Sequence, residues 1–198
     1  MNDSLFNFLA SVKELSIDLK KGISDCLHKE THPKKTLILK EGEVCERLYF
    51  IEKGFVRAFY RRNGQEITSW FMRENQMIIS VNSFFSQKPG YENLEVLEDA
   101  TLISITYGDL QLLYHKFPEF NYVGRVITEH YYSLSEERLF GMRMQSTQEK
   151  YDMLLTNHPE IFNRAPLKYI ASYLGMKPET LSRLRGQPLS HRIRKRKF

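Results

Sequence analysis

The sequence predicts an α+β fold in which a β-rich N-terminal half is followed by one long helix and a small helical C-terminal part. Three observations predict it: short β-type runs between Thr36 and Ile105, helical periodicity after Tyr107, and positive charge concentrated at the C-terminal end. The chain has 198 residues, of which 41% are hydrophobic and 27% charged, as in ordinary globular proteins. This length allows one large or two small domains.

Several classes of protein are not expected. No apolar run approaches the length needed to span a bilayer, and the first residues lack the basic region of a signal peptide. We therefore expect no membrane partner. Cys26 and Cys45 have no motif spacing, so we expect no disulfide framework and a cytoplasmic location. The sequence contains no HExxH, GxSxG, CxxC or phosphate-binding glycine loop, so we expect no enzymatic activity.

The charge is unevenly distributed along the chain. Residues 141–198 hold 12 Lys and Arg against 4 Asp and Glu, a net charge of +8, whereas residues 1–140 carry a net charge of −3. A compact basic end on a mildly acidic body is typical of a nucleic-acid-binding module joined to another domain. The alternative is a solubilising basic tail.

The chain is predicted to begin with a helix over residues 4–30, because apolar side chains recur at loosely helical intervals and His32-Pro33 ends the run. The apolar positions of this helix are Leu5, Leu9, Val12, Ile17, Ile23 and Leu27.

The β-rich part consists of short runs separated by turn residues. The runs are TLILK, RLYFIEK, FVRAFYR, EITSWF, MIISV, NLEVLE and ATLISIT. Asn63-Gly64 predicts a type I′ hairpin, whose two central residues need positive φ. We expect Arg57, Arg61 and Arg62, just before this turn, to be solvated. Many short strands at this spacing predict a double-stranded, jelly-roll-like β-roll.

After a short helix that Pro118 interrupts, a long helix is predicted from Glu119 to Met144. Its apolar residues step by three or four and predict a seam between two copies of the chain; the alternative is packing on its own roll. The predicted dimer-interface residues are Phe120, Val123, Ile127, Tyr131 and Leu134. Ser146 and Glu149 then match a capping box, which starts a new helix. The expected division is 1–118, 119–145 and 146–198.

The segment PLKYIASYLGMKPETLSRLR, from Pro166 to Arg185, splits into two short amphipathic helices. Gly175 between them can adopt a left-handed turn, and Pro166 and Pro178 suit the first turn of each helix. Together these features predict a helix-turn-helix with an outward-facing second helix. An ordinary αα-hairpin is the alternative. The C-terminal domain could be winged or wing-truncated, because residues 187–198 could form a hairpin or a basic arm.

The exposed side chains of the second helix suit the major groove of double-stranded DNA. An arginine can donate two bonds to guanine, and a glutamate can accept a bond from cytosine. Basic side chains outside the helix, which are Lys168, Arg164 and the run from Arg192 to Lys197, suit phosphates. The candidate DNA-binding residues are Lys168, Lys177, Glu179, Thr180, Ser182, Arg183 and Arg185.

The helix-turn-helix segment resembles that of the Crp/Fnr superfamily of transcription regulators. The β-rich part agrees, because Gly42, the run Leu48-Tyr49-Phe50-Ile51, Gly54 and Val56 resemble the first strands of a cyclic-nucleotide-binding roll. The resemblance covers nearly the whole chain. It implies a sequence-specific DNA-binding regulator that is a homodimer, reads an inverted-repeat operator and contacts RNA polymerase.

The same resemblance places the base-contacting glutamate and arginine of the family on Glu179 and Arg183. Relatives often have arginine just before the glutamate, and here that position is Pro178. This chain is therefore expected to read a different DNA sequence from the family's best-known members.

The resemblance fails at the sensor. The family's cyclic-nucleotide pocket uses a Gly-Glu pair for the ribose and an arginine for the phosphate, but here the two stretches read Asn75-Gln76-Met77 and Gly90-Tyr91-Glu92-Asn93. A phosphate would meet a carboxylate, which is costly in a partly buried pocket. Cyclic AMP or cyclic GMP is therefore not expected, and the effector is unknown or absent. The candidate effector-pocket residues are Arg73, Gln76, Tyr91 and Glu92.

Other sensors and functions fit less well. Two cysteines are too few for an iron–sulfur cluster. Cys45, His28, His32 and His115 could be nominated as haem ligands, and Cys26 lies close to two of these histidines, but we expect no metal and no cofactor. The alternative function is a ligand-binding or scaffold β-roll protein with a degenerate DNA-binding domain.

Overall fold

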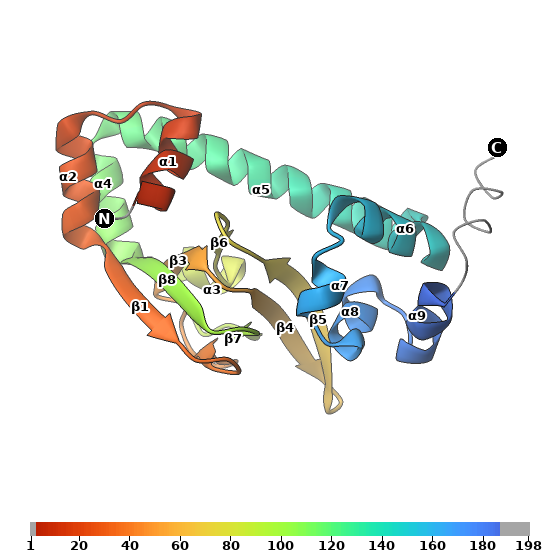
Figure 1. Cartoon of the computed structure of the whole chain (residues 1–198). Helices are drawn as coiled ribbons and strands as arrows, with labels where there is room; N and C mark the ends of the chain where they lie inside the picture. Colours follow the sequence, from red (N-terminus) through yellow and green to blue (C-terminus); the bar gives the residue numbers. More distant parts are fainter. Residues whose placement is uncertain (1–2, 187–198) are drawn as a thin grey trace.

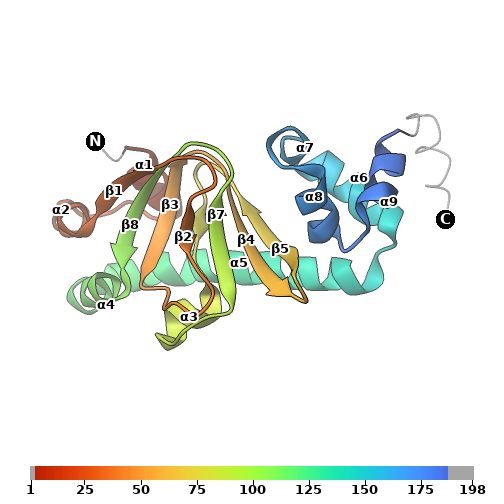
Figure 2. The same ribbon diagram turned by 90° about the horizontal axis from the view of Figure 1, so that it is seen from below.

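The computed structural model describes residues 3–186. A β-roll occupies one end of the molecule, a long helix runs along it, and a small helical module lies beside the far end of that helix (Figures 1 and 2). Among the described residues, no helix is both long enough and apolar enough to cross a membrane.

The predicted order of a β-rich part, a long helix and a small helical part is confirmed, but the N-terminal segment differs from its prediction and the helix Val81–Ser86 was not predicted. The helices are α1 (Asp3–Val12), α2 (Ile17–Cys26), α3 (Val81–Ser86), α4 (Tyr107–Lys116), α5 (Pro118–Met144), α6 (Thr147–Asn157), α7 (Ile161–Arg164), α8 (Leu167–Leu174) and α9 (Pro178–Arg185). The strands are β1 (His28–His32), β2 (Leu37–Leu39), β3 (Arg47–Lys53), β4 (Val56–Arg62), β5 (Gln65–Met72), β6 (Met77–Ile78), β7 (Glu92–Val96) and β8 (Ala100–Thr106).

The strands form two four-stranded antiparallel sheets, in the orders β1-β8-β3-β6 and β2-β7-β4-β5. These two sheets confirm the predicted β-roll. The hairpin between β4 and β5 turns at Asn63 and Gly64, whose φ values of 52° and 75° are both positive, as the predicted turn requires.

The single N-terminal helix predicted over residues 4–30 is wrong. The chain breaks after α1, and the Ser16 hydroxyl accepts a hydrogen bond from the Leu19 backbone to start α2. His28 to His32 form a strand instead, because all five residues pair with β8. The loose apolar periodicity across this segment did not distinguish one helix from two helices and a strand.

The long helix begins at Pro118, where a missing backbone N–H costs nothing, and continues to Met144 as predicted. Its predicted dimer stripe is largely wrong, because that face packs on the chain's own roll. Phe120 and Val123 are buried in the roll core, and Ile127 and Tyr131 pack against it. The Tyr131 hydroxyl also accepts a hydrogen bond from the Met77 backbone at 2.7 Å.

Buried side chains form two hydrophobic clusters. The larger one fills the roll and includes residues of α1, α2, α4 and the start of α5. The second joins Phe55, Phe71 and Leu97 of the roll to residues of α6, α7, α8 and α9, among them Ile170 and Leu181. The C-terminal helical module therefore completes its core on the surface of the roll.

Gly54 lies in the tight turn between β3 and β4, with a φ of +107°. We expect Gly54→Ala to destabilise the protein by about 1–3 kcal/mol more than Gly42→Ala, because a Cβ at Gly54 would lie 2.6 Å from Ala100 Cβ. Gly42 also has positive φ, but nothing lies within 4 Å of its added Cβ, so it controls for backbone strain. Urea unfolding measures the stability of both variants, and equal losses of stability would contradict the steric explanation.

Candidate nucleic-acid interface and sensor site

The turn between α8 and α9 has the geometry that the sequence predicts. Gly175 adopts a φ of 67°, and the Met176 backbone N–H reaches back to the Ala171 carbonyl at 3.0 Å, which closes the end of α8. Leu181 and Leu184 of α9 are buried in the cluster that also holds Ala171. The predicted helix-turn-helix and its outward-facing second helix are confirmed as structure.

The polar side chains of this motif gather on its open side. Thr180 is half-buried. The exposed candidates are Lys168, Lys177, Glu179, Ser182, Arg183 and Arg185. Because α9 turns its leucines inward, these side chains are free to meet a partner. The basic run from Arg192 to Lys197 lies outside the described residues.

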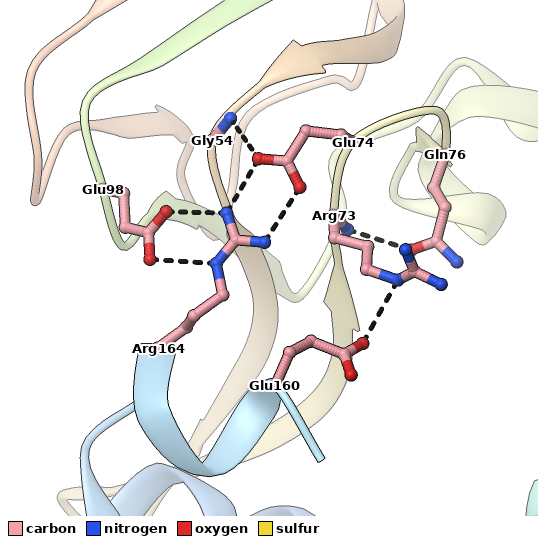
Figure 3. Close-up of polar contacts among 7 residues, drawn as sticks. All are labelled: Gly54, Arg73, Glu74, Gln76, Glu98, Glu160 and Arg164. Carbon is pink, nitrogen blue, oxygen red and sulfur yellow. Dashed lines mark hydrogen bonds and ion pairs between the residues drawn. The ribbon is translucent and has the colours of Figure 1, made fainter. Parts of the chain in front are cut away.

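Arg164, predicted to suit phosphates, is committed elsewhere. It lies at the end of α7 and bridges two carboxylates of the roll (Figure 3). Its guanidinium donates to both oxygens of Glu74 at 2.8 Å and to Glu98 at 3.0 and 2.6 Å. Glu74 also accepts a hydrogen bond from the Gly54 backbone at 2.9 Å. Hydrogen bonds from Arg164 lower the pKa of Glu74 to about 2.

Arg57, predicted to be solvated, is instead buried, with 1% of its surface exposed. Its guanidinium carbon lies 3.4 Å from the ring centre of Tyr169 on α8 and 4.0 Å from that of Phe59. Glu66 and Glu95 accept its hydrogen bonds. The strand pairing explains the difference, because Arg57 lies directly opposite Glu95 in the sheet. No local pattern in the sequence indicates that α8 covers this face.

Two further contacts hold α8 against β5. The Thr68 backbone N–H donates to the Ser172 hydroxyl at 3.1 Å, which in turn donates to the Thr68 hydroxyl at 3.1 Å. The rings of Phe71 and Tyr173 lie 5.2 Å apart. The helix-turn-helix is thus held directly by the roll as well as through α5.

The predicted effector-pocket residues lie as two separate pairs, with Arg73 beside Gln76 and Tyr91 beside Glu92. Met72, next to Arg73, pairs with Val56 of β4, whereas Glu92 pairs with Tyr60. These positions are four residues apart along the same strand, or about 13 Å. The four-residue pocket is therefore wrong.

Each of these side chains has its own local contacts. Arg73 pairs with Glu160 at 3.2 Å, and its backbone N–H donates to Gln76 at 2.9 Å (Figure 3). Tyr91 is exposed and packs against the Tyr60 ring at 5.6 Å.

Glu92 lies inside the roll with only 6% of its surface exposed. The Ser69 hydroxyl donates to its carboxylate at 2.7 Å. Burial raises the pKa of Glu92, and the neighbouring hydroxyls of Ser69, Ser80 and Tyr60 oppose that rise. An anionic ligand placed here would have to bury a second negative charge beside this carboxyl group.

No cluster of three or more His, Cys, Asp or Glu within residues 3–186 could hold a metal ion. Cys26, predicted to lie near histidines, is half-buried and reduced, and Cys45 is buried. Neither cysteine belongs to the helix-turn-helix or to the contact between α8 and β5.

Comparisons with known proteins agree with this architecture. Residues 29–117 match the family model of the cyclic nucleotide-binding domain. A search of the curated proteins by sequence finds no match.

Solved structures similar to this chain include proteins from three bacteria. FixK2 from Bradyrhizobium japonicum has a TM-score of 0.70 at 18% identity, over 84% of this chain and 86% of that chain. A putative crp/fnr-family transcriptional regulator from Eubacterium rectale has a TM-score of 0.69 at 21% identity, over 90% and 85%. The c-di-GMP-responsive global regulator CLP from Xanthomonas campestris has a TM-score of 0.67 at 15% identity, over 85% and 89%. The chain thus has the fold of these solved structures.

The Arg164 bridge predicts a pH dependence of stability. The folded-state pKa of Glu74, about 2, lies below its ordinary value of 4.5, so the bridge stabilises the fold fully above pH 4.5 and less as the pH falls towards 2. We expect Glu74→Gln to remove about 1–2 kcal/mol at neutral pH, allowing for the partial exposure of the pair, and to flatten the acid limb of the stability curve.

Urea unfolding at a series of pH values measures this effect. Glu41→Gln, at an exposed glutamate before β3, is the matched control and should follow the wild type. If Glu74→Gln were as stable as the wild type above pH 4.5, the bridge would carry no stability.

Proposed function

We propose that this chain is a sequence-specific DNA-binding transcription regulator that acts as a homodimer and does not respond to cyclic AMP or cyclic GMP. The observation that carries this proposal is the exposed polar face of α9, which stands clear of the module whose leucines hold it. A short helix that presents such a face is suited to the major groove.

Side chains on this face divide into two roles. Glu179 and Arg183 lie four residues apart on the exposed side of α9, where an acceptor and a bidentate donor can read neighbouring base pairs. Lys168 lies on α8, and Lys177 directly precedes the first residue of α9. Both are suited to phosphates, which add affinity but little sequence information. Thr180, Ser182 and Arg185 complete the proposed interface. Arg164 is excluded because its guanidinium is fully occupied by the roll.

The effector of the proposed regulator is not a cyclic nucleotide bound in the family's manner. Such a ligand needs a cation for its phosphate, and the roll offers the buried carboxyl group of Glu92 instead. A cytoplasmic location and contact with RNA polymerase go with this function.

The proposed dimer uses the outer face of α5. Tyr132 and Leu139 lie seven residues apart on one face of α5 and are 67% and 41% exposed, and Phe140, which is 62% exposed, borders that face. Apolar side chains of this size on one helix face favour a helix–helix contact between two copies. A two-fold axis along α5 would present two reading helices to one duplex, so the operator would be an inverted repeat.

The reading and anchoring roles can be separated by mutation. We expect Arg183→Ala to weaken binding to the selected operator by about 1–3 kcal/mol and to relax its preference at one base pair. Lys168→Ala should weaken binding to all sequences alike. It should also reduce the slope of log affinity against log salt concentration by about one, because one phosphate contact is lost. Operators are first selected from random DNA, and affinities are then measured over a range of salt concentrations.

If Arg183→Ala and Lys168→Ala had the same effect on specificity, the division of roles would be wrong. If the wild type bound no DNA, or bound it equally well at all salt concentrations, the regulator function itself would be wrong.

The dimer face has its own test. We expect Phe140→Asp to convert the dimer to a monomer, because it would bury a charge in the helix–helix contact. Leu112→Asp, at a leucine of α4 that is 67% exposed, controls for a charge on any exposed apolar position and should remain dimeric. Sedimentation velocity measures the oligomeric state of both variants. A monomeric wild type, or a dimeric Phe140→Asp, would contradict the proposed interface.

A further inference from the structure

A cavity of about 170 Å³ lies where the far half of α5 meets α6 and α8. Its walls are largely apolar and come from Leu134, Gly141, Met153, Leu154 and Leu174. Trp70 of β5, the single tryptophan of the chain, closes the side that faces the roll. An engineered apolar cavity of about 150 Å³ in another protein holds benzene, so this space fits one small ring.

The cavity contains a cation without a carboxylate partner. The guanidinium of Arg138 lies 3.7 Å from the ring centre of Tyr173 and 5.7 Å from that of Trp70. It donates one hydrogen bond, to the Tyr173 carbonyl at 3.0 Å, and forms no ion pair with any described residue. Burial lowers the pKa of this guanidinium. A half-buried cation without a counter-charge is costly, and an anion supplied from outside would offset that cost.

The other charged groups around the cavity do not supply this counter-charge. Lys150 adds a second positive charge, and its ammonium donates to the Met142 carbonyl at 3.0 Å. Glu137 also lines the cavity, but its side chain is exposed and makes no ion pair with Arg138. His158 lies at the rim and faces Glu160 at 3.7 Å.

We infer that this cavity binds a small organic anion, with its apolar or aromatic body against Trp70 and the leucines and its carboxylate on Arg138. The groups that would hold it come from the roll, the long helix and the helix-turn-helix, so the ligand would bridge all three. The site depends neither on DNA binding nor on dimerisation, so it would stand even if the proposed function failed.

The experiment titrates the full chain with benzoate and follows the fluorescence of Trp70. Benzoate should change the emission saturably, whereas benzamide, which has the same shape without the charge, and acetate, which lacks the ring, should not. Arg138→Met should weaken benzoate binding by about tenfold or more, since a charge-assisted hydrogen bond is lost. Arg143→Met, at an exposed arginine on the same helix, is the matched control and should bind like the wild type.

A second variant tests the site without touching the cation. Gly141 is buried in the cavity wall, and an added Cβ would approach only the mobile end of the Gln145 side chain, at 3.0 Å. Gly141→Leu should therefore fill the cavity and abolish benzoate binding while the chain remains folded by circular dichroism. The inference is overturned if the wild type does not respond to benzoate, if benzamide binds equally well, or if the response survives both Arg138→Met and Gly141→Leu.

Discussion

The arrangement of this molecule depends on one buried contact, in which Arg57 of β4 is enclosed between Tyr169 of α8 and Phe59 of its own strand. A guanidinium that is 1% exposed is tolerable only because Glu66 and Glu95 neutralise it and two aromatic faces cover it. One of those faces belongs to the helix-turn-helix. The roll alone would leave this ion cluster open to water, and α8 alone would expose its apolar face.

From this contact follows the position of the whole C-terminal module. Ser172 and Tyr173 of α8 contact β5, and Arg164 at the end of α7 binds Glu74 and Glu98 of the roll. The second hydrophobic cluster is shared between the roll and the module, so the orientation of α9 is set by the roll as well as by α5. A displacement of β5 would therefore act on α8 and α9 directly as well as through α5.

The interior of the roll holds a buried carboxyl group, that of Glu92, to which the Ser69 hydroxyl donates a hydrogen bond. A half-buried cation that forms no ion pair with any described residue lies elsewhere, at Arg138, beside a cavity that touches the roll, α5 and the helix-turn-helix. Charge therefore favours an anion at the junction of the domains and disfavours one inside the roll.

Much of this protein follows from local rules that act between near neighbours in the sequence. Asn63-Gly64 fixed a hairpin, Ser146 and Glu149 fixed the start of α6, and Gly175 fixed the turn before α9, because each depends only on residues a few positions away. Alternation and turn residues were enough for the strands of the roll except β1, whose conformation depends on pairing with β8, far along the chain.

Tertiary structure alone decided which partner each face meets. The apolar stripe of α5 was read correctly as a buried face, but periodicity cannot say whether the surface that buries it is a second copy or the chain's own roll. Arg57 was misjudged for the same reason, since a charged side chain becomes buried only when distant residues supply both its counter-charge and its cover. The four predicted effector residues were separated by strand register, which is set by pairing across the whole sheet.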